Sequence, residues 1–155
     1  MEPDIATGLF ASISPKENPV RFMIMVKASP QSEAGAMPEE QLMAAMADYH
    51  EQLAKAGALL DGNGLQPTAK GWRIRYSAGQ RTVVDGPFAE TRELVAGYTV
   101  IQVRSREEAL EWTRRFPAPH GALADGEIEV RQLFELDDFG PGASVDRFRD
   151  MSLGA

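Results

Sequence analysis

The sequence predicts a single α+β domain. Two segments each read as strand, helix, strand, and a shorter pair of alternating segments lies between them. Apolar residues recur at steps of three and four in the helical segments, and several strands alternate apolar and polar residues, as burial of one face requires. The 155 residues suffice to bury a core without disulfide bonds, and the sequence contains no cysteine.

The first of these units follows residues 1–19, which mix Gly, Ser, Pro and Lys without a period and are expected to form a flexible N-terminal arm. The continuous apolar run within residues 21–27 predicts a strand in the middle of a covered sheet. Residues 28–36 are polar and are predicted to form a loop.

The first helix is predicted over residues 39–56. Pro38 suits a helix start, an apolar stripe continues at steps of three and four, and Gly57 is typical of a helix end. A short strand at residues 58–60 is predicted to stop at the turn-forming residues 61–64.

A β-hairpin is predicted next. Residues 72–76 alternate large apolar side chains with arginines, which predicts a half-buried strand with one solvent-exposed face. Residues 77–80 form the turn, and residues 81–84 return as the second strand.

The second unit begins with a predicted strand at residues 97–103. Ser105 and Glu108 have the spacing of a capping box, which predicts the start of a helix that ends near Phe116. Residues 128–134 alternate as a final strand.

This order of elements predicts a ferredoxin-like, split βαβ sandwich with an inserted β-hairpin, in a domain spanning residues 20–140 and followed by a polar C-terminal tail at 141–155. The helices would cover one face of an antiparallel sheet. Because the other face also carries apolar side chains, we expect a second copy of the chain to cover it in a homodimer.

The composition argues against several classes of function. The net charge is −7 and the basic residues are scattered, so we expect no nucleic-acid partner. No apolar run is long enough to span a bilayer and the first residues lack a secretory signal, so we expect a cytoplasmic protein without a membrane partner. Two histidines 70 positions apart predict no metal site, and without a glycine-rich phosphate loop we expect no cofactor.

The most informative segment is residues 83–93. Two valines run into Asp85-Gly86-Pro87, so a strand is stopped by a stiff turn. Asp85, Glu90, Arg92 and Glu93 then place four ionisable groups within nine positions, around Phe88.

Asp85-Gly86-Pro87-Phe88 resembles the namesake motif of the DGPF, or YCII-related, domain family. The resemblance runs from about Phe22 to Gly140, through residues 49–53, 56–60 and 127–131. It implies a dimeric α/β barrel, in which each protomer has a cleft. The family has Glu, Thr and a basic residue, usually Lys, at positions 90–92, where this chain has Arg92.

Asp85 is a candidate general base, or a group that orients a substrate hydroxyl. The alternative is a structural Asx-turn, in which its carboxylate accepts backbone N–H groups near Phe88 or Ala89. Arg92 is a candidate for binding an oxyanion through the paired N–H donors of its planar guanidinium group, with Glu90 and Thr91 beside it. The alternative for these residues is a solvated surface helix.

His50 is the side chain best suited to move protons near neutral pH, and it lies at the border of the first helical stripe. Tyr49 is expected to line the pocket together with Phe88. The alternative is that His50 is an ordinary amphipathic residue of the helix surface. The family's proposed His–Asp pair has its histidine nearer Met46, so such a pair is not evident here.

These residues favour a small-molecule-binding, enzyme-like homodimer that uses acid/base chemistry in a cleft near the motif. The sequence shows no nucleophile, which argues against covalent acyl transfer. The alternative is a non-catalytic ligand-binding or regulatory protein. The resemblance suggests it, because family members are often encoded beside extracytoplasmic-function sigma factors.

Overall fold

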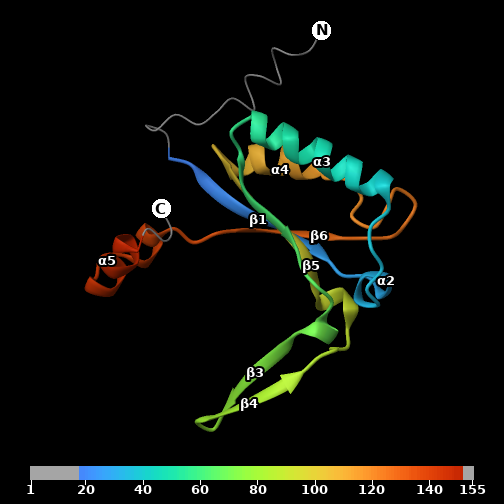
Figure 1. Cartoon of the computed structure of the whole chain (residues 1–155). Helices are drawn as coiled ribbons and strands as arrows, with labels where there is room; N and C mark the ends of the chain where they lie inside the picture. The colour runs from blue at the N-terminus through green and yellow to red at the C-terminus, as the bar shows by residue number, and fades with distance from the viewer. Residues whose placement is uncertain (1–17, 152–155) are drawn as a thin grey trace.

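The computed structural model describes residues 18–151. Its body is a four-stranded antiparallel sheet in the order β2-β5-β1-β6, with a separate two-stranded sheet of β3 and β4 (Figure 1). The strands are β1 (Val20–Lys27), β2 (Leu59–Gly64), β3 (Trp72–Ser77), β4 (Gln80–Asp85), β5 (Val95–Val103) and β6 (Ile128–Gln132). The α-helices are α2 (Pro30–Glu33), α3 (Glu40–Lys55), α4 (Arg106–Arg114) and α5 (Ala143–Asp150). The 3-10 turns are η1 (Thr68–Lys70), η2 (Thr91–Glu93) and η3 (Leu136–Phe139).

The predicted α+β class and the inserted hairpin are confirmed. Within residues 18–151 the main sheet is open, with β2 and β6 at its edges, and it does not close into a barrel. Residues 1–17 of the predicted N-terminal arm and residues 152–155 of the predicted tail lie outside the described residues.

The hydrophobic core lies between the sheet and the two longer helices, which lie on the same side of it (Figure 1). Alternation along β1 directs Phe22 and Ile24 to this side, where Phe22 pairs with Ile101 of β5. Leu53 of α3 and Trp112 of α4 complete the layer and are fully buried. Burial of such side chains contributes roughly 1.5–3 kcal/mol each to folding.

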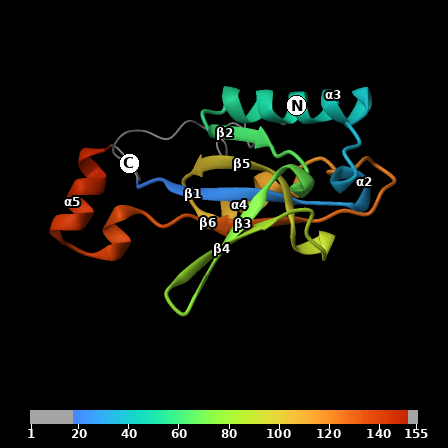
Figure 2. The same ribbon diagram turned by 60° about the horizontal axis from the view of Figure 1, so that its bottom comes forward.

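The opposite face of the sheet is also apolar in part. Met23 and Met25 of β1 are paired with Val100 and Tyr98 of β5 on this side, and the two methionines are half-buried. Figure 2 shows the hairpin projecting in front of this face, away from α3.

The predicted break at residues 61–64 is wrong, because these residues continue β2. Their pairing with β5 includes a register shift between Leu59 and Asp61. Gly97 allows the close approach, since a Cβ there would lie 3.1 Å from the Asn63 carbonyl oxygen. Strand pairing along β5 thus overrides the weak β propensity of Asp, Gly and Asn.

Two short helices were not predicted. α2 lies in the predicted loop. There the Ser29 hydroxyl accepts from the Ser32 N–H at 3.1 Å, and the Ser32 hydroxyl accepts from the Ser29 N–H at 2.9 Å. Serine replaces the usual Glu or Gln of a capping box, so the signal is weak in sequence. α5 lies in the predicted polar tail, after Gly140.

The hairpin differs from its prediction in burial. Its two-residue turn, Ala78-Gly79, has φ angles of 50° and 76°, which suits the tight connection of twisted strands. Both faces of the hairpin are exposed along nearly their whole length, instead of one face being half-buried. The reason is that it projects away from the body of the chain (Figures 1 and 2).

Candidate functional site

The motif loop begins where β4 ends. The Gly86 N–H donates to the Gly71 carbonyl at 3.0 Å, which closes the base of the hairpin, and the Gly86–Pro87 peptide bond is cis. A Cβ at Gly86 would lie 1.8 Å from the Thr68 carbonyl oxygen. Glycine is therefore required at this position because two backbone segments touch here.

Thr68 joins three separate segments of the chain. Its N–H donates to Glu33 Oε1 at 3.0 Å and its hydroxyl donates to Glu33 Oε2 at 2.5 Å, so η1 is bound to α2. The same hydroxyl oxygen accepts from the Phe88 N–H at 3.1 Å. The carboxylate, the hydroxyl and the amide therefore form one continuous chain of hydrogen bonds, which holds the motif loop against α2.

The far end of the loop is also anchored. Glu90 adopts a left-handed conformation with φ of 62° and leads into η2, where the Glu93 N–H donates to the Glu90 carbonyl at 2.8 Å. Leu94 is buried, and its carbonyl accepts from the Ala28 N–H at 2.9 Å. Thr91 is half-buried beside them. The loop is thus fixed to the end of β1.

The Phe88 ring packs beneath an arginine of the hairpin. The guanidinium carbon of Arg73 lies 3.8 Å from the centre of this half-buried ring, within the range of a cation–π contact. Arg73 is the first residue after Trp72 in β3, so this contact links the hairpin base to the loop.

The charged side chains of Asp85 and Arg92 are exposed. Asp85 lies opposite Trp72 across the hairpin. The Phe88 N–H donates to Thr68, so the structure does not use it for an Asx-turn on Asp85. Neither Asp85 nor Arg92 has a side-chain hydrogen bond or ion pair with another residue of the described chain. Both remain available to a ligand.

His50 lies between α3 and the sheet. Its Nδ1 is 2.7 Å from the Met46 carbonyl oxygen, which can only accept, so Nδ1 carries the proton in this contact. Its Nε2 is 2.8 Å from Oγ1 of Thr99, which is buried. In the neutral ring the Thr99 hydroxyl donates to Nε2. Both ring nitrogens of His50 are therefore engaged by the fold.

Tyr49 lies in the core instead of on an open surface. Its hydroxyl donates to the Trp112 carbonyl at 2.8 Å, and its ring meets Phe116 edge-on with centroids 5.1 Å apart. Burial raises the pKa of the Tyr49 hydroxyl well above its ordinary value, and the positive charge of Arg115 opposes this shift in part.

The structure thus gathers five of the seven predicted site residues on one anchored loop: Asp85, Phe88, Glu90, Thr91 and Arg92. His50 and Tyr49 lie in the layer between helices and sheet, and no hydrogen bond or ring contact within residues 18–151 joins them to the loop. Sequence reasoning missed Glu33, Thr68 and Arg73. No local signal identifies them, because each acts on a partner distant in sequence.

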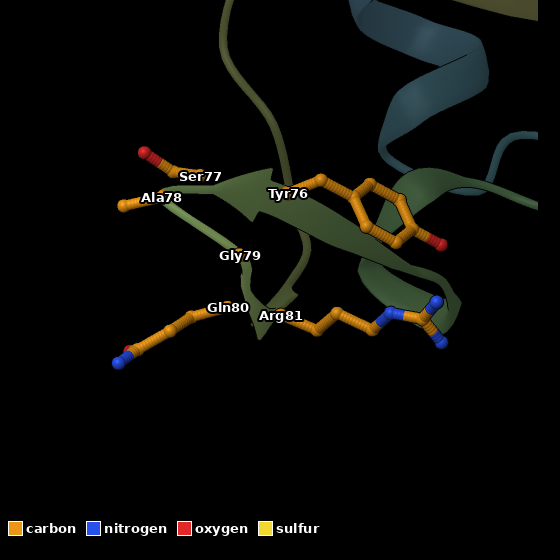
Figure 3. Close-up of a pocket in the computed structure, with 6 residues that line it drawn as sticks. All are labelled: Tyr76, Ser77, Ala78, Gly79, Gln80 and Arg81. Carbon is orange, nitrogen blue, oxygen red and sulfur yellow. The ribbon is translucent and has the colours of Figure 1, made fainter.

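A shallow hollow lies at the tip of the hairpin, lined by residues 76–81 (Figure 3). There the Arg81 guanidinium is 5.1 Å from the centre of the Tyr76 ring. The hollow is open to solvent, and it is separate from the motif loop. Across residues 18–151 no three His, Asp or Glu side chains gather as a metal site. The described helices are too short or too polar to cross a bilayer.

Comparison with known proteins identifies the family of the chain. The family model of the YCII-related domain matches residues 20–137, which is more than half of the chain. The chain belongs to the YCII-related domain family. This confirms the resemblance of Asp85-Gly86-Pro87-Phe88 to that family. A YCII-related relative, an uncharacterised protein of Rhizobium meliloti strain 1021, is 35% identical over 95 residues, covering 61% of this chain and 75% of the relative.

Replacing Thr68 with Val tests the anchor of the loop. Val keeps the shape of Thr but removes the hydroxyl that binds Glu33 and Phe88, so we expect the free energy of unfolding to fall by about 1–3 kcal/mol. Hydrogen exchange of the Phe88 amide should become faster in the same variant. Thr82→Val is the matched control, because Thr82 is exposed on the hairpin. Equal effects of the two changes in urea denaturation would contradict the assigned role.

Tyr49 predicts a pH dependence of stability. Its pKa is raised in the folded chain, so its contribution is complete below the unfolded pKa of about 10 and is lost as the unfolded state ionises above it. We expect the free energy of unfolding to fall by up to about 1.4 kcal/mol per pH unit there from this group. Tyr49→Phe should remove this slope, whereas Tyr76→Phe, at an exposed residue, should retain it. Denaturation between about pH 9 and 11 measures the difference.

Proposed function

We propose that this YCII-related protein binds a small molecule at the motif loop and performs acid/base chemistry on it as a homodimer. The observation that carries the proposal is the contrast between a fixed backbone and free side chains. Thr68, Gly86 and Phe88 anchor the loop, while Asp85 and Arg92 are exposed and unused by the described fold. A rigid support with free polar groups is the arrangement that lowers the entropic cost of positioning a ligand.

Each loop residue has a chemical role in this proposal. Asp85 is the proton acceptor or the partner of a substrate hydroxyl, because an ionised carboxylate accepts and does not donate. Arg92 binds a carboxylate or an oxyanion through its planar fork, with Glu90 and Thr91 beside it. Phe88, held under Arg73, supplies an apolar wall. We assign proton transfer to Asp85 in preference to His50, because both ring nitrogens of His50 already have hydrogen-bond partners.

The homodimer completes the proposed architecture. The order β2-β5-β1-β6, with α3 and α4 on one face, supports a ferredoxin-like arrangement. The apolar side chains of Met23, Met25 and Val100 on the other face support a second copy packed sheet to sheet, as in a dimeric α/β barrel. The second copy would then lie on the side to which the hairpin projects.

A non-catalytic binder is the second candidate. The observation that favours it is the engagement of both His50 nitrogens, which leaves Asp85 without a second proton carrier at the loop in the described protomer. The same loop would then hold a regulatory ligand, and the protein would act as a partner of an extracytoplasmic-function sigma factor.

Binding of small carboxylic acids and carbonyl compounds tests the proposed site. We expect hits, detected by NMR, to shift the amide signals of residues 85–92. Asp85→Asn and Arg92→Ala should each weaken binding by about tenfold or more, since each removes a charged contact. The double variant should bind no more weakly than the weaker single variant, because both residues act on one ligand.

Glu107→Gln is the control, because Glu107 is an exposed residue in the first turn of α4. Additive losses in the double variant would show that Asp85 and Arg92 contribute independently and do not act as a coupled pair. Unchanged binding by both single variants would remove the loop as the site. Turnover of a bound compound, lost in Asp85→Asn, would decide for the enzyme over the binder.

The homodimer is tested by sedimentation velocity of the full chain. We expect a dimer at micromolar concentration, because the partly apolar sheet face and the exposed apolar side chains of the hairpin favour a covering partner. Met23→Lys and Met25→Lys should shift the equilibrium towards monomer, since each places a charge in the proposed contact. A monomer at every concentration would contradict the dimer.

A further inference from the structure

Two segments leave the body of the chain at opposite ends of the sheet. The hairpin of β3 and β4 is inserted between Gly64 and Val95, which lie near the end of β1 where Val26 pairs with Gly97. The C-terminal arm, defined as residues 133–151, leaves β6 at Gln132, which pairs with Phe22 near the other end of β1. Figure 1 shows the hairpin and α5 projecting in different directions from the sheet.

The hairpin carries an exposed apolar stripe on one face. Cross-strand pairing places its four residues together, because Ile74 lies opposite Val83 and the flanking residues of β3 alternate to the same side. The members of this hairpin stripe are Trp72, Ile74, Tyr76 and Val83, which are 45–69% exposed. An isolated two-stranded hairpin is marginally stable in water, so a stripe of this kind favours a partner surface.

The C-terminal arm is the second exposed apolar surface. Four large side chains on it are 47–72% exposed, namely Phe134, Phe139, Phe148 and Met151. The arm is fixed where it leaves the sheet, because the Arg21 guanidinium donates twice to the Glu135 carboxylate, at 2.8 and 2.9 Å. Arg149 of α5 forms an ion pair with Asp137 of η3, which joins these two elements within the arm.

The two segments have opposite net charge. Residues 72–85 of the hairpin contain three arginines and one aspartate, in a chain whose net charge is −7. Strand pairing places Arg81 and Asp85 on the face of the stripe and the other two arginines on the opposite face. Residues 133–151 contain five acidic residues and two arginines. Two segments that carry exposed apolar side chains and opposite net charge attract each other and can cover each other's apolar side chains.

We propose that the hairpin stripe of one copy packs on the C-terminal arm of a second copy. The inference rests on the homodimer proposed above and specifies its contact. A two-fold axis lying across the strands exchanges the two ends of the sheet, so each hairpin meets the partner's arm and the contact forms twice. Because Asp85 lies opposite Trp72, at the end of the stripe, the partner's arm borders the proposed binding site.

Cysteine crosslinking tests this contact directly, because the natural sequence has no cysteine. Ile74→Cys and Phe148→Cys are placed on separate, differently tagged chains that are co-expressed and treated with a short bismaleimide. We expect a crosslinked pair that contains both tags. Ala47→Cys replaces Ile74→Cys in the control, because Ala47 is exposed on α3, away from both surfaces, and it should give only background crosslinking.

A second variant measures the energetic role of the stripe. Ile74→Lys should raise the dimer dissociation constant at least about tenfold, while Ala47→Lys leaves it unchanged. Circular dichroism should show both variants folded, since both residues are exposed in the protomer. A wild-type dimer with crosslinking no stronger than the control, or with a dissociation constant insensitive to Ile74→Lys, overturns this contact and leaves the homodimer standing. A wild-type monomer overturns both.

Discussion

The Thr68 hydroxyl is the point on which the arrangement of the candidate site depends. It donates to the Glu33 carboxylate and accepts from the Phe88 amide, so α2, η1 and the motif loop are held by one side chain. The Gly86 backbone touches the Thr68 carbonyl and bonds Gly71, which fixes both ends of the hairpin at the same place. The hairpin has little packing of its own on the body. The direction of the hairpin is therefore set by these contacts of Thr68, Gly71 and Gly86 at its base, which we call the clamp.

The packing of the protein supports placing the proposed binding site on the motif loop and not in the layer between helices and sheet. The layer between helices and sheet is filled by Tyr49, Trp112 and Phe116, whose rings meet edge to face, and the Tyr49 hydroxyl is already bonded. A close-packed layer of this kind leaves no space for a ligand without a cost in packing. The loop offers the reverse situation, because its backbone is satisfied and its charged side chains face solvent. Ligand binding at the proposed site would require ordering of a few side chains and no rearrangement of the backbone.

Sequence reasoning succeeded where the signal is local. The apolar run of β1, the stripe of α3 and the Ser105 cap of α4 depend on neighbours within one or two turns, and the structure has each of them. The motif loop was located by its turn chemistry and its family resemblance. Sequence reasoning failed where a partner distant in sequence determines the structure. β2 continues because β5 pairs with it, and Nε2 of His50 is engaged because Thr99 of β5 lies opposite. Glu33 and Thr68 carry no pattern that could identify them.

The position of Asp85 has a thermodynamic consequence. It begins the motif loop and also lies opposite Trp72 of the hairpin stripe, so the proposed ligand site and the proposed contact between copies share a border. A ligand that binds the dimer more tightly than the monomer must strengthen the dimer by the same factor, because binding free energies are reciprocal. The clamp at Thr68 makes such coupling direct, since it joins loop and hairpin as one rigid unit. In these proposals, ligand binding and dimer assembly depend on the same structural element. A change that loosens the contacts of Thr68 is therefore expected to weaken both.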